Sequence, residues 1–131
     1  MKKVLLASIV CCGLAFANVC DLDFVKEELK VNDNLSALNA PEFNFNGVKC
    51  DGDTLIYDFK YNEEVSKNLE VGSQEQKQQI GDFMKSMFKG IYCETPDFEN
   101  FRKNNVKLIY NYATTNNPNF LSLTLDNSLC Q

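Results

Sequence analysis

The sequence of 131 residues contains no histidine and no tryptophan. The absence of histidine excludes Ser-His-Asp triads, histidine general bases and most zinc sites, because each of these uses an imidazole. No P-loop, G-x-G-x-x-G or G-x-S-x-G motif occurs either, so no serine has a recognisable activating partner. We therefore expect a protein without enzymatic activity, cofactor or metal.

Long hydrophobic runs are also missing, apart from a short one near the N-terminus. Two lysines precede the apolar stretch 4–14, and Ala-Phe-Ala at 15–17 provides the small residues of a signal-peptidase site. The apolar stretch is too short to span a bilayer. We interpret residues 1–17 as a signal peptide and residues 18–131 as a single exported α+β domain.

Basic residues are scarce relative to acidic ones. Loss of the signal peptide removes two of the 13 lysines and arginines and none of the 18 acids, which leaves 11 against 18 and a formal net charge of −7. Nucleic acids and anionic membranes both attract positive fields, so this charge argues against a nucleic-acid partner. We expect a periplasmic or secreted protein that binds another protein.

The predicted mature chain retains four cysteines, an even number that indicates disulfides in a small exported domain. Four cysteines allow three pairings, and the sequence does not choose among them. Our working prediction is Cys20–Cys50 and Cys93–Cys130. No C-x-x-C pair occurs, which disfavours a metal site built from thiolates.

The other two cysteines, Cys11 and Cys12, follow the apolar residues 4–10, as a lipidated cysteine would. Lipidation would tether the domain to a membrane. However, Val10 and Cys11 precede them, whereas lipoprotein cleavage requires a small residue at that position. We therefore expect no membrane anchor unless one of these two cysteines is lipidated.

Alternating apolar residues predict four strands. The clearest runs from 54 to 61 and follows a strand that starts near Phe43, with a hairpin turn at Asp51-Gly52-Asp53. Two further strands are predicted at 106–114 and 120–125. Asp51 and Asp53 have the spacing that begins some Ca²⁺-binding loops. A predicted strand follows them and offers no further ligands, so we interpret this segment as a hairpin turn without a metal.

Helical periodicity occurs over residues 18–31 and again after a capping box formed by Ser73 and Gln76. The apolar stripe of the second, longer helix comprises Ile80, Phe83, Met84, Met87, Phe88 and Ile91. We predict an α+β fold with a single four-stranded antiparallel sheet, on which the N-terminal helix and the long central helix pack.

Some side chains of this stripe and of the adjoining strands are candidates for binding a partner. Methionine adapts to irregular apolar surfaces, and aromatic residues on a sheet can complete an apolar groove. Core packing is the competing interpretation for each of them. The candidate partner-binding residues are Met84, Met87, Phe88, Tyr57 and Tyr110.

Four runs in the C-terminal half, at 90–96, 101–106, 110–112 and 125–131, occur in an order typical of a known family. Together they resemble the β-sheet class of type II secretion pilot proteins (pilotins). In that family a helix ends in a Tyr-Cys pair, a short segment and two strands follow, and a cysteine closes the chain. The resemblance covers roughly residues 41–131.

The resemblance implies a disulfide between Cys93 and Cys130 and a role without catalysis. Pilotins bind a C-terminal amphipathic helix of the outer-membrane secretin and help it to assemble, so the implied partner is an envelope protein or a secretin segment. An acidic rim would suit a basic partner segment. Another class of function stays open, namely a periplasmic or secreted inhibitor or immunity protein that blocks a hydrolase or a toxin.

Overall fold

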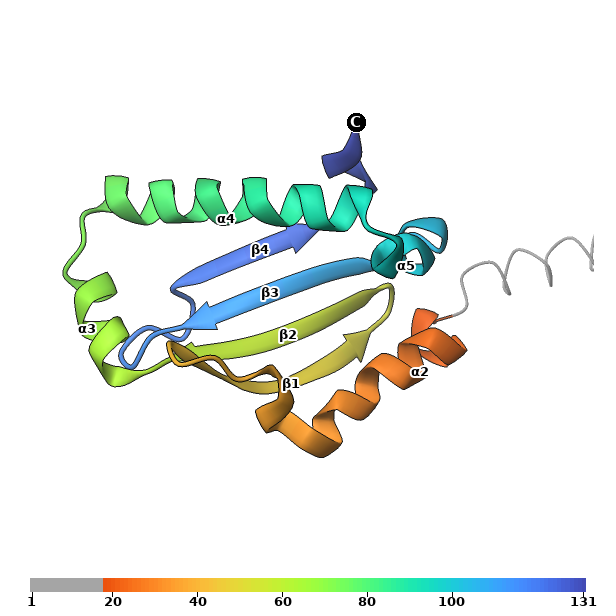
Figure 1. The fold of residues 1–131 in the computed structure, drawn as a ribbon, viewed down its shortest axis with the longest axis horizontal. Helices are drawn as coiled ribbons and strands as arrows, with labels where there is room; N and C mark the ends of the chain where they lie inside the picture. Colours follow the sequence, from red (N-terminus) through yellow and green to blue (C-terminus); the bar gives the residue numbers. More distant parts are fainter. Residues whose placement is uncertain (1–17) are drawn as a thin grey trace, which may run out of the picture.

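The computed structural model describes residues 18–131, so the predicted signal peptide, with Cys11 and Cys12, lies outside the described residues. Four strands form one sheet in the order β1-β2-β3-β4 (Figure 1). The strands are β1 (Phe43–Asp51), β2 (Thr54–Tyr61), β3 (Lys107–Ala113) and β4 (Leu121–Leu125). The α-helices are α2 (Asp23–Leu29), α3 (Glu63–Glu70), α4 (Gln74–Glu94) and α5 (Glu99–Lys103). Short 3-10 segments are η1 (Val19–Asp21), η2 (Lys30–Leu38), η3 (Pro96–Phe98) and η4 (Asn127–Cys130).

The prediction of a purely antiparallel sheet is wrong, because β2 and β3 pair in parallel. The other two pairs, β1 with β2 and β3 with β4, are antiparallel. The cause is the connection between β2 and β3. Helix α4 has 21 residues and is therefore about 31 Å long at 1.5 Å per residue, enough to return the chain along the whole of β2. After one such reversal the next strand runs in the direction of the strand before it.

Local sequence signals explain where several elements begin and end. The predicted capping box starts α4, since the Ser73 hydroxyl accepts from the Gln76 backbone N–H and the Gln76 side chain accepts from the Ser73 N–H. Gly52 has a φ of 64° in the β1–β2 turn, which a glycine adopts at low cost. The N-terminal helix is shorter than predicted, since the 3-10 segments η1 and η2 stand on either side of α2. In η2, Asn32 bonds both the N–H and the carbonyl of Val48 on β1.

The sheet has two unlike faces. Buried residues alternate with more exposed ones along β2 and β3, so one face carries the apolar side chains and the other carries mostly polar ones. The helices pack on the apolar face, but mainly at its edges: α2 and η2 lie along β1, and α4 lies along β4 (Figure 1). The middle of this face, formed by β2 and β3, lies between them.

Both predicted disulfides are present. The Cys20–Cys50 bridge joins η1 to β1, with Cα atoms 5.7 Å apart, and the Cys93–Cys130 bridge joins the end of α4 to η4, with Cα atoms 5.5 Å apart. They close 30 and 37 residues of sequence, respectively. Each therefore removes conformational freedom from a long segment of the unfolded chain.

We expect replacement of both cysteines of either bridge by alanine to lower the free energy of unfolding by about 3–4 kcal/mol, because the unfolded chain regains the entropy of an open loop. Guanidinium unfolding of the mature chain measures this loss. Alkylation of the native protein, followed by intact-mass measurement, is the control and should add no mass. Thiols that react in the native state, or variants as stable as the parent, would contradict the expectation.

Candidate partner-binding groove

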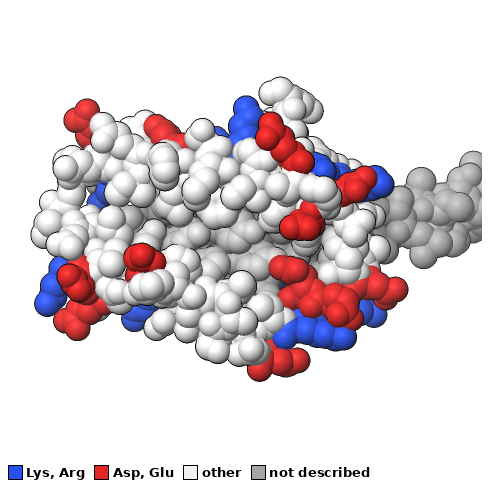
Figure 2. Space-filling view, viewed as in Figure 1, with Lys and Arg blue, Asp and Glu red and all other residues white. Residues whose placement is uncertain are grey.

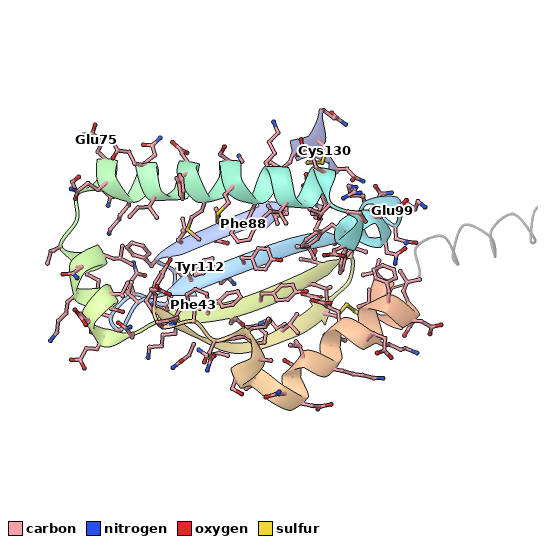
Figure 3. The ribbon with its side chains drawn as sticks, in the orientation of Figure 1. Phe43, Glu75, Phe88, Glu99, Tyr112 and Cys130 are labelled. Carbon is pink, nitrogen blue, oxygen red and sulfur yellow. A yellow bond between two sulfur atoms is a disulfide. The ribbon has the colours of Figure 1, made fainter. Side chains whose placement is uncertain are left out.

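Aromatic side chains of β2 and β3 form a continuous floor on the apolar face. Parallel pairing places Tyr57 beside Tyr110 and Phe59 beside Tyr112, and the ring centroids of these pairs are 4.8 and 5.0 Å apart. Phe88 extends from α4 (Figure 3). Its ring stacks on that of Tyr110, with centroids 5.1 Å apart. Such contacts stabilise aromatic pairs beyond simple burial, so the floor is held together by its own side chains.

The floor presents hydroxyl groups as well as rings. Tyr110 and Tyr112 are only 9% and 4% exposed, so most of each side chain is buried in the floor. Burial raises the pKa of both phenols, so they remain neutral donors at physiological pH.

One wall of the groove is the flank of α4. Met84 and Phe88 pack against the core, whereas Phe83, Met87 and Ile91 are 69%, 45% and 39% exposed. The three exposed residues recur every fourth position and therefore lie in line along the helix. We call them the α4 flank. The predicted stripe is thus wider than the contact that α4 makes with the sheet.

The opposite wall is α2. Its partly buried Glu28 accepts a hydrogen bond from the hydroxyl of Tyr57, and burial together with this carboxylate raises the pKa of that tyrosine. None of the ion pairs within residues 18–131 includes Glu28. Figure 2 shows the face hollowed between α4 and α2, with mostly uncharged residues inside and acidic residues gathered at the α2 end.

The structure brings three of the five candidate residues into direct contact, namely Tyr57, Tyr110 and Phe88. Met84 packs beside them, and Met87 lies on the α4 flank. Their role in binding a partner stays a prediction.

Sequence reasoning did not include Glu28, Phe83 or Ile91 among the site residues. The signal for Glu28 was available, because it follows Val25 by three positions and Phe24 by four, which places an acid on the apolar side of α2. Phe83 and Ile91 could have been included because both belong to the predicted apolar stripe of α4.

The chemistry of the groove suits binding. Its phenols are protonated, and Glu28 is held by one of them. Within residues 18–131 no three Cys, Asp or Glu side chains come together in a way that could hold a metal ion.

A cavity separate from the groove, of about 450 Å³, lies between α3 and α4 and shares Phe83 with the α4 flank. In the part of the chain that the structure describes, no helix is both long enough and apolar enough to cross a membrane.

No protein-family model matches the sequence, and no curated protein matches it. Solved structures with a similar fold include a protein from Pseudomonas aeruginosa that is inferred to be secreted, with a TM-score of 0.60 and 15% identity over 88% of this chain and 99% of that one. They also include the type II secretion system pilotin AspS from Vibrio cholerae, with a TM-score of 0.52 and 12% identity over 79% of this chain and 86% of that one. The fold is pilotin-like. At these identities the pilotin-like fold is what the comparisons establish.

The buried tyrosines of the floor make the stability of the protein sensitive to alkaline pH. The pKa values of Tyr57, Tyr110 and Tyr112 are raised in the folded state, chiefly by burial. Their contribution to stability is therefore complete below the unfolded value of about 10 and is lost as the pH rises above it. In an alkaline titration followed by tyrosinate absorbance, we expect these three side chains to ionise only as the chain unfolds. Ionisation of all five tyrosines at an ordinary pKa, with circular dichroism unchanged, would contradict this.

Proposed function

We propose that the chain is an exported, non-enzymatic protein that binds an amphipathic helical segment of an envelope protein in the groove between α4 and α2. The observation that carries this proposal is the α4 flank, Phe83, Met87 and Ile91, exposed beside a hollowed aromatic floor. Apolar surface in contact with water costs about 25 cal/mol per Å². A helix that covered the flank would remove this cost.

The dimensions of the groove support a helical ligand. The α4 flank extends from residue 83 to residue 91, which is about two turns and about 12 Å along the axis. Partner helices in such grooves present apolar anchors at i, i+3, i+4 and i+7, which match a flank of this length.

We further propose that the partner is a secretin and that the protein acts as its pilot. The fold shared with AspS, a type II secretion system pilotin, supports this, as does the pattern at 90–131 described above. The two disulfides support an oxidising compartment such as the periplasm, where such bonds persist. The predicted signal peptide supports the same location.

The test is binding of a synthetic peptide that spans the C-terminal segment of the secretin encoded in the source genome. We expect Phe83→Glu to weaken binding by about tenfold or more, because it places a charge in the apolar contact. Phe83 is exposed, so the substitution should not affect folding. Fluorescence anisotropy of the labelled peptide measures the affinity.

The matched control is Val71→Glu, which makes the same kind of change at a residue 84% exposed at the end of α3. We expect this variant to bind within about twofold of the parent, as is usual for a surface substitution outside a contact. A peptide that does not bind, or one that binds both variants equally, would reject the groove as the site for a secretin helix.

A further inference from the structure

We propose that Glu28 selects a basic side chain on the bound helix, so that the partner segment carries a lysine or an arginine at the edge of its apolar face. This inference rests on the proposed function and specifies the chemistry of the ligand. It depends on the position of Glu28 within the groove, on its unused acceptor capacity and on the charges around it.

A chain of contacts connects Glu28 to the α4 wall. The Tyr57 hydroxyl donates to Glu28, the Tyr57 ring contacts Tyr110, and Tyr110 stacks on Phe88 of α4. Glu28 and the α4 flank therefore stand on opposite sides of one floor. A helix that rests on this floor with its apolar face toward Met87 and Ile91 turns its adjacent edge toward Glu28.

The carboxylate of Glu28 has capacity for a further partner. A carboxylate offers about four acceptor positions, and the single proton of Tyr57 occupies one of them. Lys30, two positions further along the chain, pairs with Glu27 at 2.6 Å and not with Glu28. A helix that covered the groove would strip water from Glu28.

The cost of that desolvation produces the selectivity. An ionised group that loses water without gaining a partner destabilises the complex, whereas a pair that forms in the same place compensates. A neutral or acidic side chain opposite Glu28 is thus penalised, and a basic one is accepted. Selection therefore acts largely by exclusion of the wrong helices.

The surrounding charge favours the same ligand. Three further acids, Asp21, Asp23 and Glu27, lie on η1 and α2, and Figure 2 shows acidic side chains gathered at this end of the hollow. Lys26, on the same helix, is exposed and forms no ion pair within residues 18–131. Acids thus outnumber bases on these two elements, and their field attracts a cation to the α2 wall.

The test uses a phage-displayed library of amphipathic helical peptides, selected separately on the oxidised mature chain and on Glu28→Gln. The amide oxygen of the variant still accepts the Tyr57 proton, so the fold is retained while the charge is lost. We expect peptides selected on the parent to carry lysine or arginine at a constant offset from their apolar stripe, and peptides selected on the variant to lack this preference. The same basic preference with both proteins, or none with either, would overturn the inference.

A double-mutant cycle gives the second readout. Replacement of the selected basic residue by norleucine should weaken binding to the parent by about tenfold and to Glu28→Gln by less than about twofold. Equal losses would show that the base contacts another group and would reject the role of Glu28. A library without any peptide that depends on Phe83 would instead reject the groove itself, and the proposed function with it.

Discussion

The parallel pairing of β2 and β3 is the constraint on which the groove depends. It sets Tyr57 beside Tyr110 and Phe59 beside Tyr112, so that four large rings form one surface. It also requires a connection as long as the strands, which α4 supplies. Because α4 packs on β4, outside β3, its body does not cover the two central strands. A helix placed centrally would cover the apolar face of the sheet. Because α4 is offset, the aromatic floor remains open as a groove.

The two disulfides stabilise the walls of this groove at one end. Cys20–Cys50 holds the start of the N-terminal helical segment on β1, and Cys93–Cys130 holds the last turn of α4 on η4. At the other end of the sheet, the Glu70 carboxylate accepts two hydrogen bonds from Asn116, which connects α3 to the turn after β3. A ligand that bound in a groove held in this way would cause little further loss of conformational entropy.

Much of the fold follows from local sequence patterns. The direction of β3, and which residues of the apolar stripe of α4 pack on the sheet, do not. Alternation defined β2, and the Ser73 capping box defined the start of α4, because each signal lies within a few residues. Alternation does not reveal how strands separated by a long connection run relative to each other. The stripe of α4 predicted an apolar face but not which part of it packs. Glu28 has charged neighbours that do face water, so only its spacing from Phe24 and Val25 distinguishes it from them.

The α4 flank stays outside the contact between α4 and the sheet. Gly81 lies so near Leu121 of β4 that an added Cβ would stand 3.2 Å from its Cδ1, so α4 and β4 are in close contact at this point. The disulfide between Cys93 and Cys130 connects the far end of the helix to η4. Phe83 and Met87 are thus exposed in the part of the chain that the structure describes, and the proposed partner helix would cover them. Under the proposed function, their burial would supply affinity without regard to sequence, and a polar group at the edge of the groove, Glu28, would supply the selectivity.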